Sequence, residues 1–121
     1  MKPAPFELVR PTSVADAIDA LAAGGDEAKV LAGGQSLVPL LSMRLATPAT
    51  LVDLNRIDEL AGIEETASGR VRFGAMTRQS ALVRSTALPL VAEAARWIGH
   101  TAIRTRGTIG GSLSHADPSA E

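Results

Sequence analysis

A short apolar run, Lys29-Val30-Leu31-Ala32, stops abruptly at the glycine pair Gly33-Gly34 and is followed by Ser36 and a second apolar stretch. A run of this length before glycines is typical of a strand, and a serine before an apolar stretch is typical of a helix N-cap. A strand-like segment at 6–9 and a helix-like segment at 14–22 precede it. The order strand, helix, strand, glycine-rich turn, helix predicts an α/β (α+β) fold.

The rest of the chain continues this mixture of elements. Strands are predicted at 6–9, 29–32 and 51–54, and a hairpin is predicted from 60–65 with 71–75. Helical spacing predicts helices at 14–22, 37–45, 77–83 and 88–98. The expected N-caps of the first three are Ser13, Ser36 and Thr77, and Gly24-Gly25 is expected to end the first. Residues 100–121 are rich in Gly, Thr and Ser and predict a long structured loop. Two small lobes, about 1–56 and 57–121, are expected to join around residues 48–58.

Composition excludes several classes of function. Hydrophobic residues make up 45% and charged residues 21%, and the net charge of −1 gives no reason to expect nucleic acid or an anionic membrane as a partner. The absence of cysteine excludes thiolate metal sites and iron–sulfur clusters in this chain, and the presence of only two histidines makes a histidine metal site unexpected. No stretch approaches the roughly 20 apolar residues of a membrane span and no signal-peptide pattern is present, so a cytoplasmic location is expected.

The first glycine-rich segment, Leu31-Ala32-Gly33-Gly34-Gln35-Ser36-Leu37, has the pattern of an anion-binding loop. A strand that runs into paired glycines and then a helix presents backbone N–H groups with no side chain in the way, a geometry suited to phosphate. Gln35 and Ser36 add side-chain donors. The segment lacks both the Walker A lysine and the G-x-G-x-x-G spacing, so a plain turn that needs a positive φ remains the alternative.

A second segment, Thr108-Ile109-Gly110-Gly111-Ser112, repeats the device of two glycines flanked by hydroxyl groups. Alone, it too is compatible with a tight turn. Two such loops in one small chain favour a diphosphate ligand, because its two charged groups can be held from both sides by backbone N–H groups.

With their flanking residues, the two loops resemble a known family. The stretches that carry the resemblance are 32–41, 108–121, Pro5-Phe6 with Arg10-Pro11-Thr12-Ser13, and Leu51-Val52-Asp53-Leu54-Asn55. Over essentially its whole length the chain is similar to the flavoprotein (medium) subunit of molybdenum hydroxylases of the carbon monoxide dehydrogenase and xanthine dehydrogenase type. The FAD domain of that subunit belongs to the vanillyl-alcohol oxidase / p-cresol methylhydroxylase (PCMH) superfamily.

The resemblance implies FAD as cofactor and assigns its contacts to particular positions. The two loops would bind the FAD pyrophosphate, and an acidic residue at the end of the 116–121 stretch, here Glu121, would contact the cofactor, with Asp117 a weaker candidate. The residues implied are Leu31, Ala32, Gly33, Gly34, Gln35, Ser36, Leu37, Thr108, Ile109, Gly110, Gly111, Ser112, Asp117 and Glu121. Family members are much longer, so the PCMH-type domain is expected to be incomplete at its carboxyl end.

The same resemblance implies partners and a reaction. Such subunits take electrons from an iron–sulfur (small) subunit, which a molybdopterin (large) subunit reduces, and pass them through FAD to quinone, NAD or oxygen. Flavin supplies the redox chemistry, so no catalytic residue and no metal ligand is expected in this chain. Two alternatives stay open: a truncated remnant that no longer binds flavin, and a generic diphosphate- or nucleotide-binding module.

Several other residues carry weaker expectations. Arg104 and Arg106 flank the second loop and are compatible with either a phosphate contact or a structural role. His100 and His115 have no carboxylate at triad or metal-ligand spacing, and a catalytic role is not expected for them. Asp53 is expected to cap a turn. Trp97 is expected in the core or on a face that another segment covers.

Overall fold

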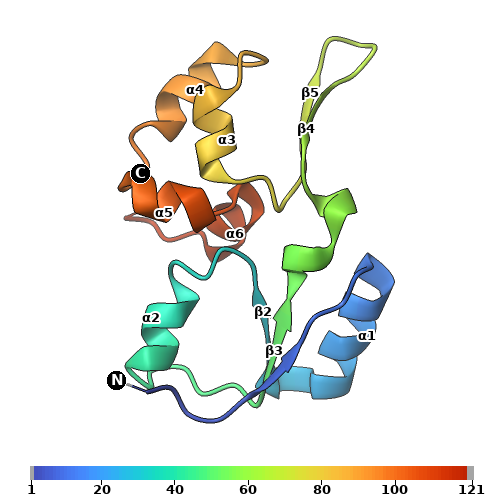
Figure 1. Ribbon diagram of the computed structural model, residues 1–121, viewed down its shortest axis with the longest axis vertical. Coiled ribbons are helices and arrows are strands. Elements are labelled where there is room, and N and C mark those ends of the chain that lie inside the picture. The colour runs from blue at the N-terminus through green and yellow to red at the C-terminus, as the bar shows by residue number, and fades with distance from the viewer. Residues whose placement is uncertain (1, 120–121) are drawn as a thin grey trace. The chain divides into compact units, whose positions relative to one another are not determined.

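The chain forms two compact units, Met1–Asp58 and Glu59–Glu121. The computed structural model describes residues 2–119, so the expectation for Glu121 lies outside the described residues. Figure 1 shows the elements of both units. The mixed helix and strand content that the sequence predicts is present in the fold.

Unit 1 is built on a parallel three-stranded sheet with the order β1-β3-β2. The strands are β1 (Glu7–Val9), β2 (Ala28–Leu31) and β3 (Thr50–Asp53). The central strand β3 holds Leu51 and Val52, which are 2% and 0% exposed. A strand flanked on both edges and covered on its faces loses almost all contact with water, which explains the apolar run Leu51-Val52.

Two α-helices, with short 3-10 turns at Gly25–Glu27 and Leu54–Arg56, complete the described part of unit 1. Helix α1 (Val14–Gly24) lies against β2 and β3, and Ala17 is buried on its inner side. The expected cap is present, because the Ser13 hydroxyl accepts a hydrogen bond from the Asp16 N–H at 3.1 Å. The helix ends at Gly25, whose φ of 53° suits glycine. Helix α2 (Leu37–Ser42) follows the glycine pair and buries Leu41.

Parallel pairing places the carboxyl ends of the three strands at one edge of the sheet. Val9 pairs with Val52 and Leu31 with Asp53, so the residues that follow these strands leave the sheet side by side. In open parallel sheets this edge is where ligands bind. The first glycine-rich loop begins here.

In its described residues, unit 2 combines a hairpin with four short α-helices. The antiparallel strands β4 (Ile63–Glu65) and β5 (Val71–Phe73) form the predicted hairpin, and the helices are α3 (Gln79–Arg84), α4 (Pro89–Ala95), α5 (Thr101–Arg106) and α6 (Ile109–His115). Helix α3 packs against both α4 and α5. The core of this unit contains Met76, Leu82, Ala92 and Ala95.

The expected loop at 100–121 is wrong for most of its length, because α5 and α6 occupy it. Two glycines and two serines give α6 a poor intrinsic helix propensity, which hid it in the sequence. Hydrogen bonds outside the helix offset that deficit. The Thr108 hydroxyl accepts from the Gly111 N–H at 3.1 Å, and the N–H groups of Ile109 and Gly110 donate to carbonyls elsewhere in unit 2.

Two of the expected helix caps are also wrong. Ser36 has helical backbone angles and makes no capping hydrogen bond, and α2 ends at Ser42 rather than at 45. Thr77 lies before α3 and is 4% exposed, with its hydroxyl turned toward the hairpin. Serine and threonine hydroxyls bind any nearby backbone group, so their position before a helix does not ensure capping.

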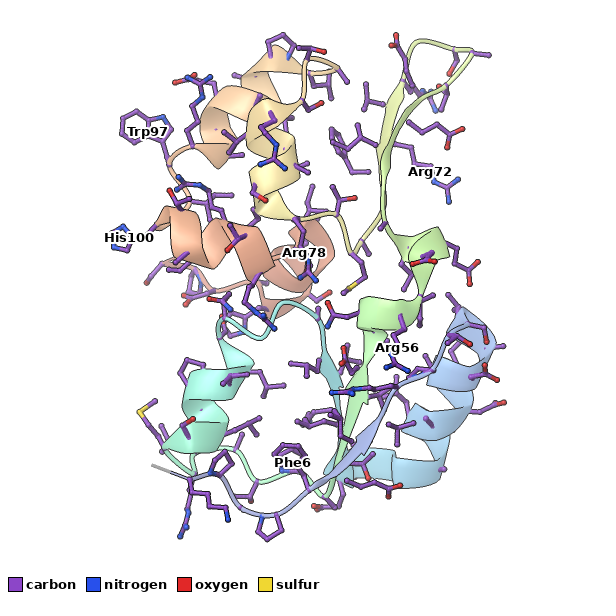
Figure 2. The ribbon with its side chains drawn as sticks, in the orientation of Figure 1. Phe6, Arg56, Arg72, Arg78, Trp97 and His100 are labelled. Carbon is purple, nitrogen blue, oxygen red and sulfur yellow. The ribbon has the colours of Figure 1, made fainter. Side chains whose placement is uncertain are left out.

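Several large apolar side chains remain exposed. Leu90 is 83% and Trp97 73% exposed, and Figure 2 shows the Trp97 ring projecting away from its backbone. The expectation of a core position for Trp97 is therefore wrong for the described residues. Its alternative, a face covered by another segment, stays an expectation.

The Thr77 hydroxyl bonds two backbone groups of the segment before β4, and its removal tests how much these bonds stabilise unit 2. The hydroxyl donates to the Gly62 carbonyl at 2.8 Å and accepts from the Gly62 N–H at 3.0 Å. We expect Thr77→Val to lower the free energy of unfolding by about 2–3 kcal/mol, because it leaves two partly buried backbone groups unpaired. Thr77→Ser, which keeps the hydroxyl, should cost about 1 kcal/mol. Urea denaturation of both variants measures this, and equal losses would contradict the role of the hydroxyl.

Candidate anion site at the glycine-rich loops

The first loop leaves the sheet directly from β2. Its residues Ala32, Gly33 and Gly34 are half-buried, whereas Gln35 and Ser36 are exposed. Gly34 has a φ of 72°, the left-handed region that favours glycine. A Cβ at Gly34 would also lie 3.0 Å from the Val38 side chain. Glycine is therefore required at this position for backbone conformation and for packing.

Three consecutive carbonyls of this loop are bound by protein groups. The Asn55 side-chain amide donates to the Ala32 carbonyl at 3.0 Å, and the Gln35 side-chain amide donates to the Gly33 carbonyl at 3.1 Å. The Val38 N–H donates to the Gly34 carbonyl at 2.9 Å and starts α2. The Gln35 amide nitrogen, expected as a donor to phosphate, thus has a partner within the loop.

The N–H groups of the same loop have no such partners. Among residues 2–119, the backbone N–H groups of Gly33, Gly34, Gln35 and Ser36 donate to no protein acceptor. In a trans peptide the N–H points away from the carbonyl of the preceding residue. The bound carbonyls therefore leave a run of unused donors at the ligand-binding edge of the sheet, which is the chemistry of an anion site.

A polar network behind the loop holds Asn55 in place. Asp53 accepts hydrogen bonds from the backbone N–H of Asn55 at 3.0 Å and from its side-chain amide, and Arg10 forms an ion pair with Asp53 at 3.5 Å. The geometry agrees with the expected turn-capping role of Asp53. Asn55 was not among the residues that the sequence predicted for the site. Its signal was a polar side chain two residues after the end of a strand at this edge.

The second loop is different, because its N–H groups are already used. The Ile109 N–H donates to the Thr77 carbonyl at 3.1 Å, and the Gly110 N–H donates to the Ala75 carbonyl at 2.8 Å. The Gly111 N–H donates to the Thr108 hydroxyl, and the Ser112 N–H to the Thr108 carbonyl. The expectation that this loop offers its backbone N–H groups to a phosphate does not match these hydrogen bonds.

These contacts join the second loop to the segment before α3 as a short antiparallel bridge. Arg78 pairs with Thr108, the Gln79 N–H donates to the Gly107 carbonyl at 2.9 Å, and the Arg78 guanidinium donates to the Arg106 carbonyl. Figure 2 shows Arg78 beside α6. Thr108 is 2% exposed. We call the paired segments 75–79 and 106–110 the clasp.

Glycines permit the close approach within the clasp. A Cβ at Gly110 would lie 2.6 Å from the Ala75 Cβ and 2.7 Å from the Ala75 carbonyl oxygen. A Cβ at Gly107 would overlap the side-chain oxygen of Gln79, a buried atom with no hydrogen-bond partner among the described residues. Both positions need glycine for packing. What the second loop presents to solvent is the side chain of Ser112 and, beyond α6, that of Asp117.

The basic residues near the second loop have structural partners. One Arg104 nitrogen donates to the carbonyls of Ile98 and Gly99, both at 2.9 Å, and so satisfies acceptors just beyond the end of α4. Arg106 supplies its carbonyl to the clasp and has an exposed side chain. His100 and His115 are exposed at helix ends.

The described residues contain no cluster of His, Cys, Asp or Glu that could hold a metal ion. Within the same range, no helix has the length and apolar character needed to cross a membrane.

Comparison with known families and curated proteins gives consistent matches. The model of a family described as the FAD binding domain in molybdopterin dehydrogenase matches residues 4–121. The chain is 51% identical to the 6-hydroxypseudooxynicotine dehydrogenase complex subunit alpha of Paenarthrobacter nicotinovorans, over 100% of this chain and 42% of that protein. It is 47% identical to the carbon monoxide dehydrogenase medium chain of Hydrogenophaga pseudoflava, over 98% of this chain and 42% of that protein. The chain thus spans less than half the length of both relatives.

Solved structures give the same result for the fold. A chain of carbon monoxide dehydrogenase from Hydrogenophaga pseudoflava matches with a TM-score of 0.96 and 46% identity, over 100% of this chain and 43% of that chain. A chain of quinoline 2-oxidoreductase from Pseudomonas putida 86 matches with a TM-score of 0.93 and 39% identity, with the same coverage.

The packing at Gly110 can be tested without a ligand. We expect Gly110→Ala to push α6 away from Ala75 and to break the Gly110 N–H hydrogen bond, because the added methyl group overlaps backbone atoms. Amide hydrogen exchange at Ile109 and Gly111 should accelerate by about tenfold or more. Ser114→Ala, on the exposed part of the same helix, is the control and should leave both amides unchanged. Unaltered exchange in Gly110→Ala would show that the clasp does not hold α6.

Proposed function

The chain belongs to the family of FAD binding domains of molybdopterin dehydrogenases, and from this premise we propose that it supplies the pyrophosphate-binding part of an FAD site. The proposal covers a part of the site, because the chain spans 42% of the length of the two relatives described above. The resemblance deduced from the loop sequences is thereby confirmed at the level of the family.

The observation that carries the proposal is the run of unused N–H groups at Gly33, Gly34, Gln35 and Ser36. The oxygen atoms of a pyrophosphate accept hydrogen bonds and do not donate them, so a row of backbone N–H donors suits this ligand. The neighbouring carbonyls are bound by Asn55, Gln35 and Val38 and so are directed away from these donors. The residues present therefore fit a diphosphate.

The second loop would contribute in another way. Its N–H groups are held by the clasp, so a contact with the cofactor would come from the Ser112 hydroxyl and from the glycine surface at Gly111. Four neighbouring residues would hold these loops in place: Leu31, Leu37, Thr108 and Ile109. Asp117 follows α6 and would be the weaker candidate for a contact with the cofactor. The role of Glu121 remains the one that the family resemblance implies.

We further propose that the chain acts within a larger oxidoreductase complex. Its relatives include a "complex subunit alpha" and a "medium chain", names that place those proteins in multisubunit enzymes. When bound, FAD would supply the redox chemistry. The partners that the family resemblance implies are an iron–sulfur small subunit, a molybdopterin large subunit that reduces it, and an external electron acceptor. This chain would bind and orient the cofactor.

Titration with flavin and nucleotide tests the binding proposal. We expect FAD to bind the 121-residue chain, with ADP binding more weakly because it lacks the flavin half. Flavin fluorescence and isothermal calorimetry give both dissociation constants. Equal affinities for FAD and ADP would favour a generic diphosphate module, and the absence of binding to a folded chain would favour a remnant that has lost its flavin site.

Gly34→Val isolates the contribution of the first loop. A β-branched residue at a φ of 72° is strained, and its Cβ meets Val38, so the loop must rearrange. We expect the FAD dissociation constant to rise by at least about tenfold. Gly69→Val is the matched control, because Gly69 has a φ of 74° in the hairpin turn with nothing within 4 Å of its Cβ position. Similar FAD affinity in both variants would argue against the loop.

A further inference from the structure

The donors of the first loop are directed by side chains that lie outside the loop sequence. We propose that Asn55 is a positioning residue that fixes the direction of the Gly33 N–H through the Ala32 carbonyl. The inference rests on the proposed function for its biological meaning, and it extends that function to a residue outside both glycine-rich motifs.

Asn55 contacts the peptide unit between Ala32 and Gly33. The Ala32 carbonyl and the Gly33 N–H belong to one planar trans peptide, so they point in opposite directions. The Asn55 amide nitrogen lies 3.0 Å from the Ala32 oxygen. Holding that oxygen therefore sets the direction of the Gly33 N–H. Without a fixed partner, a peptide beside glycine rotates easily, because glycine tolerates many backbone conformations.

The Asn55 amide is itself oriented by two acceptors. Its nitrogen donates both to the Ala32 carbonyl and to a carboxylate oxygen of Asp53. Carbonyl and carboxylate oxygens are acceptors only, so the amide must turn its NH₂ group toward both of them. The amide orientation is thus fixed by the chemistry of its two neighbours.

Asp53 is in turn supported by Arg10. Its second carboxylate oxygen lies 3.5 Å from the Arg10 guanidinium, and its side chain is 14% exposed. Arg10 directly follows β1, and Ala32 directly follows β2. Asp53 is the last residue of β3, and Asn55 lies two residues beyond it. The parallel sheet therefore brings together one contribution from the end of each strand. A relay of polar contacts runs from Arg10 to the loop.

The next peptide, between Gly33 and Gly34, is held by a different residue. The Gly33 carbonyl is held at 3.1 Å by Gln35, a residue of the loop itself. The direction of the Gly34 N–H is therefore set locally, whereas that of the Gly33 N–H depends on Asn55, which lies 23 positions beyond Ala32 in the chain. Loss of Asn55 should alter the first donor and spare the second.

The test uses the 121-residue chain labelled with ¹⁵N and the variants Asn55→Ala and Asn55→Leu. Both remove the donor without adding a charge, and leucine keeps the approximate size of the side chain. Residual dipolar couplings report the direction of each N–H, and FAD titration reports affinity. We expect the Gly33 coupling to change and the Gly34 coupling to remain. The FAD dissociation constant should rise about fivefold, the effect of misdirecting one donor of a set.

Thr12→Ala is the matched control, because Thr12 is an exposed neutral residue of the same unit. It should change neither the Gly33 coupling nor the affinity. The urea midpoint of each variant separates positioning from stability, since general loosening of unit 1 would alter couplings throughout the sheet. A change restricted to the loop supports the inference.

The outcomes also separate this inference from the proposed function. An unchanged Gly33 coupling in both Asn55 variants overturns the positioning role, whatever the affinity. A changed coupling with unchanged FAD affinity keeps the role of Asn55 in setting the peptide and overturns the role of the Gly33 N–H in binding FAD. If the unaltered chain binds neither FAD nor inorganic pyrophosphate, the proposed function fails, and the Gly33 coupling still decides whether Asn55 sets the peptide.

Discussion

The parallel pairing of three short strands is the constraint on which the rest of unit 1 depends. Because β1, β2 and β3 run in the same direction, their carboxyl ends meet at one edge of the sheet. This brings Arg10, Asp53 and Asn55 close to the first glycine-rich loop, although none of them is near that loop in the sequence. Burial of Leu51 and Val52 in the central strand fixes that strand between the other two. The meeting of these residues at one edge thus follows from the shared direction of the strands.

The two glycine pairs look alike in sequence, yet their physical roles differ. Gly34 allows a left-handed turn that leaves neighbouring N–H groups without acceptors in the described chain. Gly110 allows α6 to approach Ala75, and the N–H groups around it are bonded within unit 2. The first loop is therefore suited to direct donation, whereas the second is suited to holding a surface in place.

Much of the fold could be predicted from local pattern, but part of the site could not. The strand at 29–32, the helix capped by Ser13 and the hairpin follow from periodicity and turn residues, which act over a few positions. Helix α6 escaped prediction because its stability comes from carbonyls of Ala75 and Thr77, more than 30 residues earlier. The role of Asn55 toward Ala32 escaped for a related reason, since a polar residue after a strand end does not reveal which neighbouring strand end it contacts.

The clasp connects the base of the hairpin to the second glycine-rich loop through hydrogen bonds of Thr77. Thr77 bonds the hairpin through Gly62 and the second loop through Ile109, so the order of that loop is acquired when the unit folds. A ligand that binds only the folded form draws on the same equilibrium. If the second loop takes part in the proposed cofactor site, folding and binding are thermodynamically linked, and the hairpin base influences affinity without touching the ligand.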